Sequence, residues 1–429
     1  MSSRRRILQT LGASGAIALA GCASDGDGSD NTNGSNGNGG ATTPQEVGTV
    51  RLGNIAPTSG PAGAYGEEIL NATRLAAKQA VEAGEVKDVE HLDGDSQYDP
   101  GTARQVASDH ISEGVDVLHG AISDAGTQAI SELADQEDLP HIGRSGNLTF
   151  DLRECRPNTF SFSPSILGWT ENGVGYCVRN DLGSKVYTIG YDYSWPQDHV
   201  QYLTEGLLPQ TDAESVGVSL LELGTEDFSG PLTEAKNAGA DILNLNMTGT
   251  GFLTALSQAR EFGFIEEGAV ITNGGGNTAM GPGIDPEIRT YENFYLGLEW
   301  HQSINAPAAD KFVKSFQEEY DSVPGVSVVH YVGVRTLLAA IGEAGSKETD
   351  DVIDALEGRE LKPQIWGENE TWRACDHRFK IPAVTAQGLP DGEDDYFEVV
   401  NINTNYDQLT IPCDQTVCVS DNQPDWFSG

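Results

Sequence analysis

Polar and glycine-rich segments recur where predicted strands give way to predicted helices, and they are the residues best suited to bind a small molecule. Residues 57–66 include Ser59 and Tyr65 among glycines, which let the backbone approach a ligand closely. A second segment begins with Ser123 and Asp124. A third supplies Ser145, Gly146 and Asn147. Hydroxyl groups beside helix N-termini form a cradle for a carboxylate or another polar head group, although the same residue types also simply cap helices.

The second half of the chain offers aromatic side chains at comparable positions. Tyr193 and Trp195 follow the predicted strand 185–191, and Thr248 follows another, 241–246. Exposed aromatic groups at a strand end suit closure over a ligand. The alternative is that Tyr193 and Trp195 belong to a hydrophobic core.

An alternation of strands and helices positions these loops. In the first half it places strands at 50–56, 89–92 and 116–122 and a fourth that starts after Pro140. Helical spacing occurs at 69–80, a helix begins at about Pro100, and another covers 125–136. A second series follows from Ser165, with strands at 185–191, 215–221, 241–246, 269–272 and 294–299, helices at 253–262, 310–320 and 325–342, and β character at 397–402 in an otherwise irregular tail. This repetition predicts an α/β fold with two doubly wound parallel sheets, and thus two lobes. Ligands bind where the carboxyl ends of such strands converge, so a solute would lie between the lobes.

Motifs of common enzymes are missing from the sequence. It contains no G-x-S-x-G, G-x-x-x-x-G-K or H-E-x-x-H motif and no complete G-x-G-x-x-G motif. The glycines at 274–276, 281 and 283 lack cofactor spacing and indicate a flexible loop near a hinge. We therefore expect no catalytic residues, no metal and no cofactor.

The chain is strongly acidic, with 65 Asp and Glu residues against 25 Lys and Arg and a formal charge of −40. Such an excess repels itself in dilute buffer, whereas at molar salt the Debye length falls to about 3 Å and distant charges are screened. This composition resembles that of extreme halophiles. It argues against nucleic acid as a partner, because phosphate binding needs basic patches.

Six cysteines are present. Apart from Cys22, five remain, and two bridges with one free thiol can be drawn among them in fifteen ways, between which the sequence does not choose. The five are Cys155, Cys177, Cys375, Cys413 and Cys418. Cys413 and Cys418 are close enough in sequence to form a local bridge.

The N-terminus indicates export. Arg4, Arg5 and Arg6 precede a short apolar stretch, Leu11–Ala20, which is typical of a twin-arginine signal. Small residues before Cys22 resemble a lipobox, so residues 1–22 would be a lipoprotein signal; an ordinary cleavage site is the alternative. Residues 23–47 are rich in Ser, Gly and Asn and predict a flexible linker. We expect a mature protein of charge −43, lipid-anchored on the extracellular face of the membrane.

Several segments, in this order and spacing, resemble the branched-chain amino acid (leucine/isoleucine/valine-type) solute-binding proteins of ABC transporters. They are residues 52–60 with 65–66, 120–123 with Thr127, 190–193, 225–229 before 240–241, and 372–378. The resemblance covers nearly all of residues 48–405 and implies the type I periplasmic binding fold, with three hinge crossings. It implies lobe one at 48–165 plus 300–371 and lobe two at 166–299 plus 372–429. By position, Tyr65, Ser123, Asp124 and residues 145–147 would face the ligand from lobe one, and Tyr193 from lobe two.

Two departures from the family pattern leave the ligand open. Amino acid binders of this type present an acidic side chain from lobe two, but residues 246–250 contain none. Asp124 stands where the family has a small hydroxyl or Gly. Asp124 either receives the ligand ammonium from the other lobe, or the ligand is an amide, urea or an organic acid; Asp124 as a helix cap is a further alternative.

The resemblance implies a solute-binding protein that delivers its ligand to the permease subunits of an ABC importer. A sensory lipoprotein that uses the same crevice is one alternative, and a secreted hydrolase is another.

Overall fold

The computed structural model describes residues 47–60, 62–268, 270–273, 292–367, 369–388 and 397–427. The predicted signal, Cys22, nearly all of the predicted linker and the glycines at 274–276, 281 and 283 lie outside the described residues. No helix in the described part of the chain is long and apolar enough to cross a membrane.

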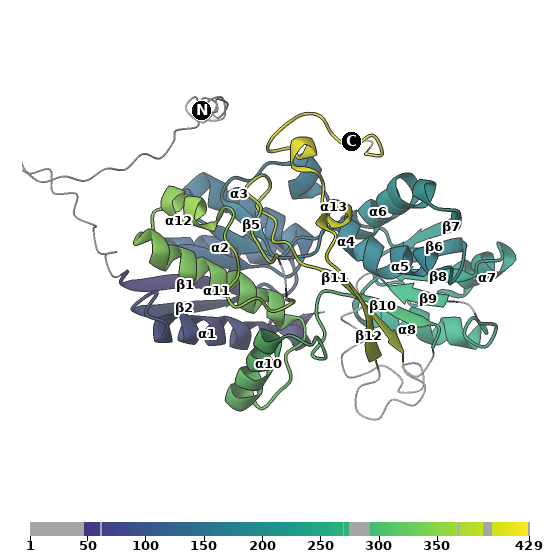
Figure 1. The fold of residues 1–429 in the computed structure, drawn as a ribbon, viewed down its shortest axis with the longest axis horizontal. Coiled ribbons are helices and arrows are strands. Elements are labelled where there is room, and N and C mark those ends of the chain that lie inside the picture. Colours follow the sequence, from purple (N-terminus) through teal and green to yellow (C-terminus); the bar gives the residue numbers. More distant parts are fainter. Residues whose placement is uncertain are drawn as a thin grey trace, which may run out of the picture. The chain divides into compact units, whose positions relative to one another are not determined.

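The first sheet has five parallel strands in the order β2-β1-β3-β4-β5 (Figure 1). Strand β1, which lies between β2 and β3, is buried on both faces, with Leu52 in one hydrophobic cluster and Ile55 in another. This pattern is typical of parallel strands that are covered by helices on both sides. The strands are β1 Thr49–Ala56, β2 Asp88–Asp95, β3 Val117–Gly120, β4 His141–Gly143 and β5 Thr159–Ser161.

Helices cover both faces of this sheet. One face packs against α1 and the long apolar α11, whose Ala76 and Leu337 belong to the same cluster as Leu52. The other face packs against α2 and α3, through Ala103 and Ile130. The helices are α1 Gly66–Glu82, α2 Pro100–Ser112, α3 Asp124–Glu137, α10 Pro307–Tyr320, α11 Ser327–Ala344 and α12 Thr349–Leu356.

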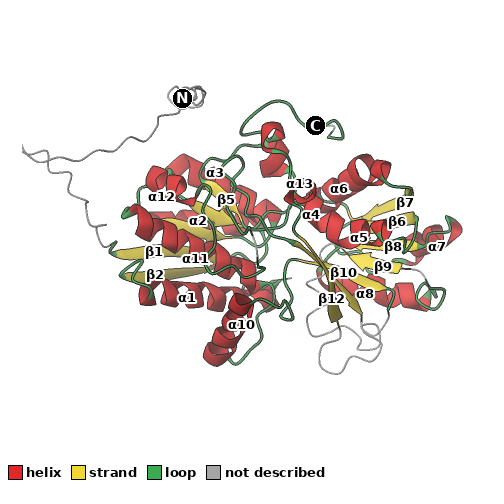
Figure 2. Cartoon of the chain, in the orientation of Figure 1, coloured by secondary structure: helices red, strands yellow, loops and turns green. Residues whose placement is uncertain are grey.

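The second sheet has seven strands in the order β12-β11-β10-β9-β8-β6-β7. The strands from β6 to β10 are parallel, and β11 and β12 add an antiparallel edge (Figure 2). The strands are β6 Lys185–Tyr191, β7 Glu214–Leu221, β8 Ile242–Asn246, β9 Val270–Asn273, β10 Phe294–Leu298, β11 Ala383–Gly388 and β12 Phe397–Asn403. The helices around it are α4 Ile166–Thr170, α5 Tyr176–Arg179, α6 Ser194–Gln201, α7 Ser229–Asn237 and α8 Gly249–Glu261, and the tail adds α13 Tyr406–Leu409.

The prediction of two α/β lobes with parallel sheets is confirmed, and β5 and β11 are the strands that it missed. The chain passes between the sheets three times: after β5, after β10 and before β11. The predicted lobe boundaries themselves stay predictions. A parallel bridge between Ser161 and Arg378 places the start of the segment after residue 371 beside the first sheet.

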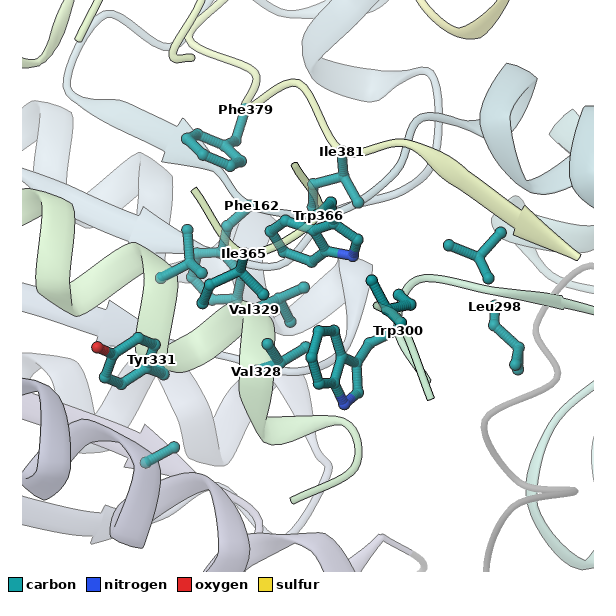
Figure 3. Packing of buried hydrophobic residues seen from close by; sticks show 14 of the residues in the cluster. Phe162, Leu298, Trp300, Val328, Val329, Tyr331, Ile365, Trp366, Phe379 and Ile381 are labelled. Atoms are coloured by element: carbon teal, nitrogen blue, oxygen red, sulfur yellow. The ribbon is translucent and has the colours of Figure 1, made fainter. Parts of the chain in front are cut away.

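Aromatic packing lines the second crossing. Trp300, just after β10, contacts Trp366 edge to face, with ring centroids 6.2 Å apart (Figure 3). The indole nitrogen of Trp366 donates to the carbonyl of Glu299 at 2.8 Å. Because these side chains are buried, the crossing that carries Glu299 is held against the first lobe.

The C-terminal tail is attached by two disulfides, Cys155–Cys418 and Cys375–Cys413. Cys177 is free and buried, and burial raises the pKa of its thiol to about 12. The suggested local bridge between Cys413 and Cys418 is therefore wrong. Local proximity along the chain did not decide the pairing, because folding brings Cys155 beside Cys418.

Candidate functional site

The loop after β1 is anchored by Asp95 at the end of β2. The Oδ1 atom of Asp95 accepts from the backbone N–H groups of Thr58 and Ser59, at 2.9 and 3.2 Å. Its Oδ2 atom accepts from the Ser59 hydroxyl at 2.5 Å. The hydroxyl of Ser59, a predicted ligand contact, thus donates its hydrogen bond to Asp95, and its oxygen can only accept a hydrogen bond from a solute.

The same loop ends at Tyr65, directly before α1. Tyr65 packs partly buried against the cluster that contains Ile69 and Leu70. The next residue must be glycine, because a Cβ at Gly66 would lie 2.3 Å from the carbonyl oxygen of Pro57. Close packing of the loop on the first turn of α1 therefore sets the position of the Tyr65 ring.

Tyr98 is a site residue that the sequence analysis missed. It follows β2 in a turn whose φ of 62° lies in the left-handed region, and 38% of its side chain is exposed. Burial of the phenol nevertheless raises the pKa of Tyr98, and the charge of Asp124 raises it further, while Arg144 lowers it. The strand-end rule would have found Tyr98 if the predicted strand 89–92 had been extended to its actual end at Asp95.

Ser123 and Asp124 have different roles. Ser123 is the N-cap of α3, where its Oγ accepts from the N–H of Gly126 at 3.2 Å. Asp124 is not the cap: its Oδ1 accepts from the N–H groups of Gly146 and Asn147, at 2.7 and 3.3 Å. Burial raises the pKa of Asp124, although these hydrogen bonds act in the opposite direction. Asp124 thus joins the loop after β3 to the loop after β4.

The loop after β4 is rigid and largely buried. The Ser145 hydroxyl donates to the Asn147 side-chain oxygen at 3.2 Å, and the Ser145 carbonyl accepts from Arg378 at 2.9 Å. Ser145 and Asn147 are 1% and 3% exposed. The Asn147 amide also donates to Ser194 of α6, in the second lobe, at 3.4 Å. This buried loop therefore holds the carboxylate of Asp124 in place through its backbone N–H groups.

Arg144 begins the third predicted loop, 144–147, but was not singled out there as a ligand contact. It donates to Glu299 at 3.0 Å, and its guanidinium lies 5.8 Å from the ring centre of Trp169. Burial alone would lower the pKa of Arg144, but the charge and hydrogen bond of fully buried Glu299, together with the charges of Asp124 and Tyr98, outweigh burial and raise it. The ion pair connects the loop after β4 to the second crossing.

The second lobe presents Tyr193 toward the first. Burial raises the pKa of the Tyr193 phenol, nearby Tyr98 and Asp124 raise it further, and a hydrogen bond with Thr248 opposes them. Trp195 is only 7% exposed and packs in a core cluster, 5.9 Å from the ring of His199. The expectation of an exposed aromatic at Trp195 is therefore wrong, and the core alternative holds for it.

A further polar contact joins the lobes. Asp198 of α6 accepts from the N–H of Leu148 at 2.9 Å and from both terminal nitrogens of Arg153, at 2.9 and 2.6 Å. Asp198 is 3% exposed, so its carboxylate is shielded from water, while the Arg153 side chain is 34% exposed.

Tyr65, Tyr98 and Asp124 of lobe one and Tyr193 of lobe two lie near one another: Tyr98 is within electrostatic reach of Tyr65 and Asp124, and Tyr193 is within reach of Tyr98 and Asp124. These groups can hydrogen-bond, stack and carry one negative charge. Among the described residues, no group of three or more His, Cys, Asp or Glu side chains is placed to hold a metal ion.

Comparison with known proteins identifies the family of this chain. A sequence model described as periplasmic binding protein matches residues 49–393. This chain belongs to the periplasmic binding protein family. The predicted resemblance to the leucine/isoleucine/valine-type members is confirmed by a Leu/Ile/Val-binding protein homolog from Brucella melitensis, 23% identical over 331 residues, which cover 73% of this chain and 82% of the relative.

Solved structures share the periplasmic binding protein fold. An amino acid ABC transporter substrate-binding protein from Pseudomonas fluorescens has a TM-score of 0.76 at 21% identity, covering 83% of this chain and 96% of its own. A solute-binding protein from R. palustris, solved with benzoate, has a TM-score of 0.68 at 18% identity, covering 82% and 96%. A leucine-binding protein from Thermotoga maritima has a TM-score of 0.67 at 18% identity, covering 83% and 99%. At these identities the likeness establishes the fold alone.

Proposed function

We propose that this protein captures a small solute between its two lobes, outside the cell, and delivers it to the permease subunits of an ABC importer. Membership of the periplasmic binding protein family supports this, as do relatives that are named as substrate-binding proteins of such transporters. The observation that carries the proposal is the meeting of Tyr98 and Asp124 with Tyr193 across the lobes.

The solute site consists of these neighbouring groups. Tyr65, Tyr98 and Asp124 contribute from the first lobe, and Tyr193 with Thr248 from the second. Ser59, Ser123 and the backbone of residues 145–147 hold these groups in place. Trp195 acts through packing rather than contact.

Binding stabilises a closed arrangement of lobes that hinge about the three crossings. The contact of Asp198 with Leu148 and Arg153 supports a preferred orientation of the lobes. The permease recognises the closed form, and an ATPase on the other side of the membrane drives import.

Residues 1–47 deliver and anchor the protein. The arginines at 4–6 direct it to twin-arginine export, Cys22 receives the lipid, and residues 23–47 form the tether. The acidic surface keeps the protein soluble at high salt. Mass spectrometry of the mature N-terminus tests this part: a lipid on Cys22 is expected, and an unmodified N-terminus elsewhere would contradict it.

A thermal-shift screen in molar KCl tests solute capture, with amino acids, amides, amines, urea, sugars and carboxylates. A ligand at a hundred times its Kd adds about 2.7 kcal/mol to the free energy of unfolding. Tyr98→Ala and Tyr193→Ala should each abolish the shift, whereas Leu223→Ala, at a side chain that is 70% exposed, should keep it. No shift with any solute class, or an undiminished shift in both tyrosine variants, would overturn the proposal.

A further inference from the structure

The backbone donors at the end of β4 are already occupied. The N–H groups of Gly146 and Asn147 both donate to Oδ1 of Asp124. The N–H of Ser145 donates to the hydroxyl of Ser161 at 3.2 Å. A solute carboxylate at this place would find its donors taken and a negative charge beside it.

The arginines near the site are also paired. Arg144 is matched by Glu299, and it further donates to the carbonyl of Ile122 at 3.4 Å. Arg378 is matched by Asp151 and donates to the carbonyl of Ser163. Each pair sums to zero, so the carboxylate of Asp124 leaves this part of the site with a net charge of about −1 when it is ionised.

Tyrosines of both lobes lie near this charge: Asn147, whose backbone N–H donates to Asp124, also donates from its side-chain amide to Ser194, the residue after Tyr193. Burial raises the pKa values of Tyr98 and Tyr193, and the charge of Asp124 raises both further, which shows that the two phenols lie within its electrostatic reach. A cation over an aromatic face is attracted by the ring quadrupole. A positive group beside Asp124 would therefore be favoured by the carboxylate and the rings together.

Asp124 keeps room to accept from a solute. An ionised carboxylate offers about four acceptor sites. The two backbone N–H groups and the nearby Ser145 side chain use at most three of them. Burial raises the pKa of Asp124, so its charge is poorly solvated and gains from a cationic partner.

We propose that Asp124 is the specificity-determining residue of this site and selects a small solute that presents a positively charged nitrogen group, an amine or an amidinium, in place of a carboxylate. The proposal deepens the solute-capture function and rests on it. The head group meets Asp124, and the ring faces of Tyr98 and Tyr193 lie against it.

Matched planar probes test this choice: benzamidine, benzamide and benzoate share one shape and differ in head-group charge. Butylamine, butyramide and butyrate form an aliphatic set. Each is titrated calorimetrically and by thermal shift against the wild-type protein in molar KCl. The cationic member of a set should bind tightest and the carboxylate weakest.

Asp124→Asn isolates the charge, because it keeps a side-chain oxygen for the N–H groups of Gly146 and Asn147. The affinity for the cationic probe should fall roughly tenfold to a hundredfold, as for loss of one charged hydrogen bond, while the neutral probe changes little. Asp181→Asn is the matched control, because Asp181 is exposed and its φ of 56° suits asparagine. That control should leave all affinities unchanged.

The outcomes separate the two proposals. Tightest binding of a carboxylate or an amide, or a cation affinity that Asp124→Asn does not lower, would overturn the selection by Asp124 and leave solute capture standing. Absence of binding by every solute class would overturn solute capture, and the selection with it.

Discussion

Replacing Arg378 by methionine should destabilise the protein strongly. Arg378 is 1% exposed and its Nε and Nη2 atoms contact the carboxylate oxygens of Asp151 at 2.8 and 2.7 Å. Its Nη1 atom donates to the carbonyls of Ser145 and Ser163, at 2.9 and 3.1 Å. Burial alone would lower the pKa of Arg378, but the carboxylate of Asp151 and the charges of Asp376 and Asp124 together raise it, so the guanidinium stays charged.

The magnitude follows from the groups left behind. Removal of one partner of a buried ion pair costs about 3–5 kcal/mol, because the remaining charge has no solvent. Two buried carbonyls that lose a hydrogen bond add roughly 0.5–1.5 kcal/mol each. We expect the free energy of unfolding to fall by about 4–8 kcal/mol. The double variant with Asp151→Asn should recover part of this loss, since it removes the unpaired charge.

Urea denaturation at constant KCl measures these differences. Lys78→Met is the control, because the Lys78–Glu319 pair has side chains that are 48% and 41% exposed, and it should cost less than about 1 kcal/mol. A loss below about 2 kcal/mol for Arg378→Met, or a double variant no more stable than the single one, would refute the reasoning.

Three further outcomes are expected. Burial lowers the pKa of His199 from 6.5 to about 3, so the unfolded chain takes up the proton of this imidazole at a higher pH than the folded protein. The free energy of unfolding should therefore fall as the pH drops from 6.5 toward 3, and His199 contributes at most about 1.4 kcal/mol per pH unit to this fall. His199→Gln should make the fall less steep in urea titrations. Gly66→Ala should cost about 1–3 kcal/mol in thermal unfolding, because the new Cβ lies 2.3 Å from the Pro57 carbonyl oxygen. Replacing both Cys375 and Cys413 by serine should cost about 2–4 kcal/mol in urea, since a bridge between residues 38 positions apart is lost.

For each of these three predictions, a specific outcome would contradict it. An unchanged pH slope in His199→Gln would show that this imidazole is not the neutral buried group described above. Gly230→Ala is the control for Gly66→Ala, because a Cβ at Gly230 meets nothing within 4 Å, and equal losses in both would contradict the steric argument. A serine double variant as stable as the parent would show that the tail is held without its bridge.

Local features of the fold could be predicted because their causes lie close together in the chain. The strand of β1 and the helix of α3 follow from apolar periodicity within a few residues. Ser123 as a helix cap needs only its own turn. The strand β11 was missed because it pairs with β10 and β12 in an antiparallel edge that no local pattern announces.

Some residues of the candidate site could likewise be predicted from the sequence, and others could not. Strand-end position alone identified Tyr65, Asp124 and Tyr193 as candidates. It could not show that Trp195 is buried, because burial depends on the helices that pack around α6. Tyr98 was overlooked because the predicted strand stopped short of Asp95.

Composition and local periodicity, acting within single turns and strands, determined the acidic character, the two α/β lobes and the loops where a solute could bind. Tertiary structure alone decided that Cys155 forms a disulfide with Cys418, 263 residues away. It also decided that Asp124 accepts hydrogen bonds from the backbone N–H groups of Gly146 and Asn147. Both depend on which strands become neighbours. That order is set by packing across the whole sheet, so it is not encoded in any short stretch of residues.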